Sequence, residues 1–256
     1  MVLVGAMSSS SDVVTVEFLA TDRHLIDQYP IVASSQALPA WFKAIPTPSS
    51  QLRGDANAKT CPGLLDYLTL GYTVPLWSDY MVRVDAERNT YAQGTWEGSF
   101  DFFTEKHTLG LVPGTESTKT SVKLTSPWAV RTPPGWSILC LPLLYAPLDG
   151  FEVLAGVVAT DVMHHFDVIV NATFVDDAKL LPAGTPLCQI VPFRRERTAA
   201  ETRLVDGEEM SYLQAAGFGS VYGSRRLIAR GYRHALRKAS QARDAERAGR
   251  PRWRRG

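Results

Sequence analysis

The sequence predicts a mainly β protein, α+β overall, and three observations support this. Short runs rich in β-branched and aromatic residues recur between positions 121 and 193. Turn-forming clusters separate these runs, at Pro133–Gly135, Pro147–Gly150 and Pro182–Pro186. The close spacing of the runs favours a sandwich or a barrel over a parallel α/β sheet.

The first half of the chain combines predicted strands with short helices. We expect residues 1–12 to be a disordered leader and residues 13–120 to form an α+β portion packed on the core. The sequence VVTVEFL alternates as a strand does. The expected elements are a strand over 13–19, a helix over 36–45, a helix after Pro62 that stops at Gly71, and strands over 72–84 and 89–103.

The β signal is strongest over 121–197, which we expect to form the core. The predicted strands are 121–124, 129–132, 137–141, 151–158, 166–171 and 187–192. Residues 198–256 are polar and then basic, and we expect a short helix over 210–216, a glycine-rich loop over 217–223 and a basic helix over 225–247.

Charge is unevenly distributed along the chain. Of its 27 basic and 26 acidic residues, 12 and 2 fall in 225–256, which leaves 15 basic and 24 acidic residues in 1–224. An acidic body with a basic tail is not the pattern of a nucleic-acid-binding domain. We therefore expect no nucleic-acid partner. The tail is either solvated and partly disordered, or it binds a polyanion or a neighbouring subunit.

The sequence also predicts the cellular compartment of the protein. No run of 18 apolar residues exists for a membrane span, and the apolar start is too short for a signal sequence. We expect a cytoplasmic protein with no membrane partner.

The three cysteines are odd in number and widely spaced, so they predict neither a disulfide framework nor a metal knuckle. Cys140 and Cys188 lie inside apolar runs and are predicted to be packed core thiols. Cys61, before Pro62, is either a buried cysteine or a nucleophile at a helix start, with His107 as its candidate base.

The sequence His164-His165-Phe166-Asp167 offers the best chemistry. On a strand, His165 and Asp167 share one face and Phe166 points to the other. A His-x-Asp pair is two-thirds of the facial triad that holds iron in non-haem oxygenases, so a divalent metal such as iron is a candidate cofactor, with His107 as the third ligand. The alternatives are acid–base catalysis without a metal, or a hydrogen-bonded pair with a structural role.

Several motifs between 133 and 223 resemble those of the dUTPase and dCTP deaminase superfamily. They are Pro134-Gly135-Trp136, Ala155-Gly156-Val157-Val158, the strand that ends at Asn171, Ala183–Ile190, and Gly217-Phe218-Gly219-Ser220. The resemblance implies a β-clip fold, a dUTPase-like barrel, and a homotrimer.

The residues that perform dUTPase chemistry are missing. Ala159 stands where the family has its water-activating carboxylate, and Val162 stands where it has the base-reading tyrosine. Residues 142–145 provide no phosphate-binding hydroxyl or cation in register. The resemblance therefore implies a scaffold without dUTPase activity. The alternative is that Asp161, two positions after Ala159, substitutes for the missing carboxylate.

The whole chain also resembles an uncharacterised protein family of phage genomes and bacterial gene clusters. The residues that carry this resemblance are Leu38–Phe42, Cys61-Pro62, Gly71–Pro75, Pro127-Trp128 and Pro186–Phe193. That family has no established activity, so the resemblance implies no mechanism.

These observations lead to two functional hypotheses. The first is a small-molecule enzyme of an accessory or biosynthetic pathway that uses a repurposed dUTPase-like pocket, with His165, Asp167 and His107 as catalytic or metal-binding residues and Asp161, Trp128 and Phe218 as ligand-binding residues. The second is a non-catalytic ligand-binding or assembly protein. Aromatic side chains such as Trp77 and Tyr80 are either stacking platforms or core residues.

Overall fold

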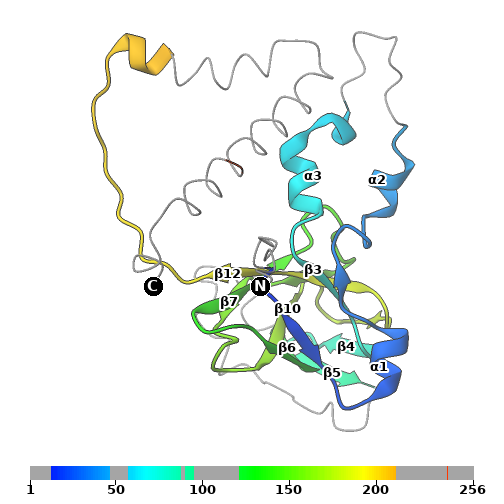
Figure 1. Ribbon diagram of the computed structural model, residues 1–256. Coiled ribbons are helices and arrows are strands. Elements are labelled where there is room, and N and C mark those ends of the chain that lie inside the picture. The colour runs from blue at the N-terminus through cyan, green and yellow to red at the C-terminus, as the bar shows by residue number, and fades with distance from the viewer. Residues whose placement is uncertain (1–12, 47–56, 88–89, 95–120, 212–240, 242–256) are drawn as a thin grey trace, which may run out of the picture. The chain divides into compact units, whose positions relative to one another are not determined.

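The computed structural model describes residues 13–46, 57–87, 90–94, 121–211 and 241 (Figure 1). These residues belong to two compact units. The first contains the described residues of 1–37 and 69–197, and the second those of 38–68 and 198–256. The described strands are antiparallel and form three open sheets rather than one closed barrel, which confirms the mainly β class.

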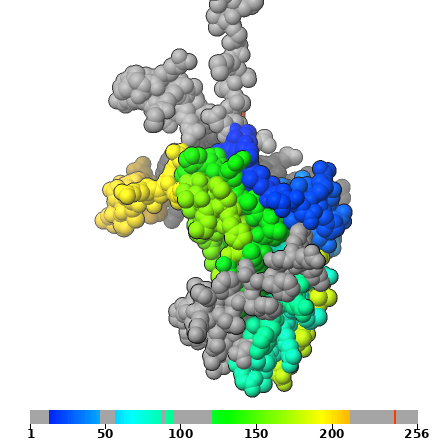
Figure 2. All heavy atoms as spheres, turned by 90° about the horizontal axis from the view of Figure 1, so that it is seen from below, coloured from blue at the N-terminus to red at the C-terminus, as the bar shows by residue number. Residues whose placement is uncertain are grey.

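The four-stranded sheet has the order β1-β6-β10-β8. Its centre is the long strand β6 (Ser121–Arg131), paired with β10 (His165–Ala172). The short strands β1 (Glu17–Leu19) and β8 (Phe151–Val153) form its edges. The start of the described chain, dark blue in Figure 2, lies against the green residues that follow position 121, as the β1–β6 pairing requires.

The five-stranded sheet has the order β2-β3-β12-β7-β9. Its strands are β2 (Val32–Ala33), β3 (Tyr72–Pro75), β12 (Pro186–Arg194), β7 (Trp136–Pro142) and β9 (Gly156–Val158). Gly71 precedes β3 with φ of +63°, and a Cβ there would lie 2.2 Å from the carbonyl oxygen of Ile190. Only glycine permits this close approach of two backbones.

The three-stranded sheet has the order β11-β4-β5. It contains β11 (Asp177–Leu181), β4 (Tyr80–Val84) and β5 (Thr90–Gly94). Burial alternates along β4, with Val82 and Val84 fully buried between exposed residues. One face of this sheet therefore packs on the core and the other faces solvent.

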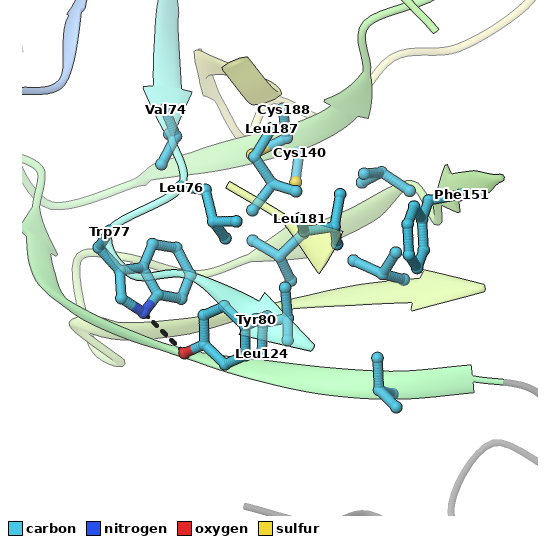
Figure 3. Close-up of a cluster of buried hydrophobic side chains, with 14 of the residues drawn as sticks. Val74, Leu76, Trp77, Tyr80, Leu124, Cys140, Phe151, Leu181, Leu187 and Cys188 are labelled. Atoms are coloured by element: carbon cyan, nitrogen blue, oxygen red, sulfur yellow. Dashed lines mark hydrogen bonds between the residues drawn. The ribbon is translucent and has the colours of Figure 1, made fainter. Parts of the chain in front are cut away.

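Side chains from all three sheets form one hydrophobic core, part of which is shown in Figure 3. Trp77 and Tyr80 lie within it, 2% and 3% exposed, and the Trp77 indole Nε1 donates a hydrogen bond of 3.0 Å to the Tyr80 hydroxyl. Leu25 of helix α1 (Arg23–Gln28) joins the same core. The Asp22 carboxylate caps α1 by accepting a hydrogen bond from the His24 amide.

The second unit contains α2 (Ala40–Ala44), η1 (Ala58–Thr60) and α3 (Pro62–Leu68). The Lys59 ammonium donates to the carbonyl oxygens of Lys43 and Ile45 and so ties η1 to the end of α2. Residues 207–211 form a further helical turn. None of the described helices is long and apolar enough to cross a membrane.

Some expected elements differ in extent from the observed ones. The helix after Pro62 is present, whereas the strand expected over 13–19 is only Glu17–Leu19 and the helix expected over 36–45 is only Ala40–Ala44. The strands expected at 121–124 and 129–132 form one strand, β6. The expected strands over 72–84 and 151–158 are each divided between two sheets, because the chain passes from one sheet to another within them. The expected leader 1–12 lies outside the described residues, as do 95–103 of a predicted strand, 212–216 of the predicted short helix, the loop 217–223, and all of the basic helix predicted over 225–247 except residue 241.

Candidate functional site

Strand β10 presents one polar and one apolar face, as the sequence predicts. His165 is exposed and Asp167 is partly exposed, whereas Phe166 and Val168 are 2% and 1% exposed. His165 and Asp167 therefore lie on the outer face of the four-stranded sheet, and the alternate residues fill the core.

A β-bulge lies directly opposite these two residues. Ala129 of β6 pairs with His165, and Thr125 pairs with Asp167. Three residues of β6, Ser126–Trp128, thus stand opposite the single residue Phe166. The bulge accommodates Pro127, which has no N–H to give to the ladder, and the Ser126 hydroxyl accepts a hydrogen bond of 3.1 Å from the Trp128 amide. Bulges of this kind re-aim side chains and are frequent beside functional sites.

Three side chains meet at the bulge. The His165 Nε2 lies 3.0 Å from Asp167 Oδ1, and the Lys123 ammonium lies 2.5 Å from Asp167 Oδ2. The side chains of His165, Lys123 and Asp167 are 53%, 32% and 17% exposed, so the carboxylate is the most enclosed member. We call Lys123, His165 and Asp167 the surface triad.

When the imidazole is neutral, the hydrogen bond with Asp167 selects one of its two tautomers. An ionised carboxylate can only accept hydrogen bonds, so Nε2 of His165 must carry the proton that it shares with Asp167. In the neutral imidazole the lone pair is then on Nδ1. A histidine oriented in this way by a carboxylate is suited to accept a proton from a bound molecule.

Sequence reasoning predicted His165 and Asp167 but missed Lys123. Lys123 lies 44 positions upstream of Asp167 on another strand, where it pairs with Ile169, two residue pairs beyond Asp167. The sequence signal for an ion pair was limited to a basic residue on one predicted strand and an acidic residue on another. The pairing register was needed to bring the two together.

The triad is a poor match for a metal centre. Among the residues that the structure describes, no three His, Cys, Asp or Glu side chains lie close enough to hold a metal ion together. The expected third ligand, His107, lies outside the described residues. Lys123 places an ammonium group beside Asp167 Oδ2, where a cation bound to both oxygens would have to approach.

Asp161 lies in a turn, three residues beyond the end of the nearest strand. That strand, β9, ends at Val158. Its carboxylate forms an ion pair with Arg195 and accepts a hydrogen bond of 2.7 Å from the Gly135 amide. The hydrogen bond from Arg195, with that from Gly135, holds the pKa of Asp161 below its ordinary value. Both oxygens of the Asp161 carboxylate thus bind groups of the protein itself.

The other expected ligand-binding residues do not join the triad. Trp128 is 3% exposed and packs in the core, and its Nε1 has no hydrogen-bond partner among the described residues. Phe218 lies outside those residues. Trp77 and Tyr80 are core residues, as one of the two interpretations of the aromatic side chains predicts.

The cysteines differ in their surroundings. Cys140 and Cys188, on neighbouring strands, are buried in the core, which confirms the prediction (Figure 3). The hydrogen bond with Cys140, together with burial, raises the pKa of the Cys188 thiol. Both side chains thus pack within the core. Cys61 is exposed and not buried, and its candidate base His107 is not among the described residues.

Comparison with known proteins gives structural neighbours only. No protein-family model matches the chain, and no curated protein sequence matches it. Its structure is similar to the native dUTPase of EIAV, with a TM-score of 0.34 and 9% identity over 75% of this chain and all of that one. A mutant dUTPase from phage phi11 of S. aureus gives a TM-score of 0.33 and 7% identity over 75% of this chain and 99% of that one.

A dUTPase mutant of Staphylococcus bacteriophage 80alpha gives similar values, with a TM-score of 0.33 and 8% identity over 76% of this chain and 93% of that one. These neighbours belong to the superfamily that the sequence motifs resemble. Scores of this size assign no activity to the chain.

Proposed function

We propose that the protein is a small-molecule enzyme that uses acid–base chemistry at the surface triad. The observation that carries this proposal is the line of contacts from the Lys123 ammonium through the Asp167 carboxylate to the His165 imidazole. Asp167 orients the imidazole, His165 exchanges a proton through Nδ1, and Lys123 holds the carboxylate in place. Of the acid–base and metal alternatives, the position of Lys123 supports the acid–base version.

A reagent that reports proton abstraction tests this role without knowledge of the natural substrate. The probe is 5-nitrobenzisoxazole, in which a base removes the carbon-bound proton while the ring N–O bond breaks and releases a coloured phenolate. We expect the protein to accelerate this reaction and His165→Gln to reduce the rate about 10²-fold, as for loss of a general base. Asp167→Asn should reduce it less.

His24→Gln is the matched control, because His24 is exposed and lies on α1, outside the triad. Equal rates for the wild type, His165→Gln and His24→Gln would contradict the proposal. Calorimetry with Fe²⁺, Mn²⁺ and Zn²⁺ tests the metal version separately. Binding that His165→Gln and Asp167→Asn both abolish would replace acid–base catalysis by a metal centre.

A second candidate function, an assembly protein, is favoured by the outer face of the three-stranded sheet. Met81, Tyr91 and Leu180 are 46%, 47% and 51% exposed on this face, and Met81 is directly paired with Leu180 across β4 and β11. Exposed Met and Tyr side chains beside a charged residue, here Arg83, are typical of protein interfaces.

Light scattering tests this second candidate. If copies of the chain associate through this face, Met81→Lys together with Leu180→Lys should reduce the measured mass to that of one chain. The control is Val157→Lys, since Val157 is 60% exposed on β9, in another sheet. An unchanged mass in the first variant would contradict assembly through this face.

A further inference from the structure

The turn between β9 and β10 is held by polar contacts on both sides. Arg195 donates from Nη1 to Asp161 Oδ1 at 2.8 Å and from Nη2 to Oδ2. The same Nη1 also donates to the Ser137 hydroxyl at 2.9 Å, and the Arg195 amide donates to the Gly135 carbonyl at 2.8 Å. The ion pair between Asp161 and Arg195 thus joins the turn to the start of β7 and to the end of β12.

A second set of contacts joins the turn to β6. The hydroxyls of Thr132 and Thr160 lie 2.8 Å apart, and both residues are buried. The Thr160 carbonyl oxygen lies 2.9 Å from Nδ1 of His164, whose own carbonyl accepts a hydrogen bond of 2.7 Å from the Val130 amide. The chain is therefore fixed up to the residue before His165.

Apolar packing contributes little to the order of this turn. Val162 and Met163, at its tip, are 79% and 62% exposed. By contrast, the Asp161 side chain is 7% exposed and makes hydrogen bonds with Arg195 and Gly135. A partly enclosed, bidentate carboxylate–guanidinium pair fixes geometry more strongly than exposed apolar contacts do.

The position of His165 depends on this turn as well as on the β6 ladder, in which His165 pairs with Ala129. The bulge interrupts the register between His165 and Asp167, so regular pairing of the later part of β10 does not carry through to His165. The chain reaches His165 directly from the turn, four residues after Asp161. What fixes Asp161 therefore fixes where β10 begins.

We infer that Asp161 and Arg195 are positioning residues for the proposed base, and that their ion pair holds His165 in hydrogen-bonding contact with Asp167. This inference rests on the proposed function for its catalytic meaning, but the structural coupling stands separately. Asp161 acts through the turn and touches no reacting atom.

The test is the tautomer of His165, read by long-range ¹⁵N–¹H NMR on the full chain. At a pH at which the ring is neutral, we expect His165 of the wild type to be the Nε2–H tautomer. In Asp161→Asn and in Arg195→Gln we expect a mixture of tautomers at His165 and no change at His24. The charge-reversed double variant, Asp161→Arg with Arg195→Asp, should restore the Nε2–H form in part.

Loss of stability alone would not move the tautomer at one histidine, so this measurement separates positioning from a general structural role. Arg195→Lys, which keeps the charge and loses the bidentate geometry, gives a second variant if Asp161→Asn fails to fold. A His165 tautomer that is unchanged in every folded variant would overturn the inference.

The 5-nitrobenzisoxazole assay on the same variants distinguishes the two proposals. If His165→Gln retains full activity while Asp161→Asn still changes the His165 tautomer, the proposed function fails and the coupling stands. If His165→Gln loses activity while Asp161→Asn leaves both the rate and the tautomer unchanged, the proposed function stands and the positioning role fails.

Discussion

At the scale of single residues, strand alternation accounts for the pairing of His165 with Asp167. Two residues that are two positions apart on a strand point to one face, and the buried Phe166 between them fixes which face is the outer one. Lys123 and Arg195 had no such local signal. Their partners lie 44 and 34 positions away in the chain, so only the folded backbone brings the charges together.

The hydroxyl of Tyr80 should contribute measurably to stability. Tyr80→Phe would leave the buried Nε1 of Trp77 without its acceptor, and we expect the free energy of unfolding to fall by about 1–3 kcal/mol. Denaturant titration measures this difference. Tyr91→Phe is the control, since that side chain is 47% exposed, and it should change stability by less than about 0.5 kcal/mol. Equal effects of the two substitutions would show that the buried hydrogen bond contributes nothing specific.

Asp161 should contribute to the dependence of stability on pH. Its pKa in the folded state is below the ordinary value because of Arg195 and Gly135, so its contribution is fully present above the unfolded value of about 4. The contribution is lost as the pH falls through the lower, folded value. Asp161→Asn should therefore make the acid limb of the unfolding free energy less steep below about pH 4.

Glu17→Gln is a useful comparison for that experiment. The hydrogen bond from Arg131 also lowers the pKa of Glu17, but both side chains are about half exposed, so solvent screens this pair. Its effect on the acid limb should be the smaller of the two. The interpretation of Asp161 is wrong if its variant and the wild type lose stability in parallel as the pH is lowered.

At the scale of elements, backbone contact between β12 and the residue before β3 requires glycine. Gly71→Ala combines a φ of +63° with a Cβ 2.2 Å from the Ile190 carbonyl oxygen, which belongs to the rigid backbone of β12. We expect a loss of about 3 kcal/mol or more in unfolding free energy, or no folded protein. Thermal and denaturant unfolding measure it.

The variant Gly184→Ala separates the cost of the positive φ from the cost of the steric clash. Gly184 has a φ of +79°, but the nearest atom to a new Cβ is a Tyr29 ring carbon at 3.6 Å, an ordinary contact. This variant therefore shows the cost of the backbone conformation alone, about 1–2 kcal/mol. A Gly71→Ala loss no larger than that of Gly184→Ala would mean that the two backbones separate easily.

The elements also show where sequence patterns stop being informative. The pattern predicted the position of β7, β10 and β12 well because each is rich in apolar residues and lies within one sheet. It missed the division of 151–158 into β8 and β9, since the apolar residues continue across the change of sheet. It also missed β11, whose residues Asp177–Leu181 are mostly exposed and carry two charges.

At the scale of the whole molecule, the distribution of charge predicts self-association that depends on salt. Residues 225–256 contain 12 basic and 2 acidic residues, whereas the rest of the chain contains 15 basic and 24 acidic residues. If the tail binds the acidic body of a neighbouring copy, the mass from light scattering should fall as salt is raised, because ions screen exposed charges. A chain that ends at Ser224 should have the same mass at all salt concentrations. A full chain whose mass ignores both salt and truncation would exclude this contact.

The sequence by itself determined the fold class, the positions of β7, β10 and β12, and the shared face of His165 and Asp167. Each of these follows from local periodicity and turn chemistry, which act over a few residues. Only the tertiary structure decided that Lys123 joins Asp167, that Arg195 engages Asp161, and that a bulge interrupts the ladder beside His165. The register of distant strands sets these contacts, and register results from the packing of the whole core, not from any one segment.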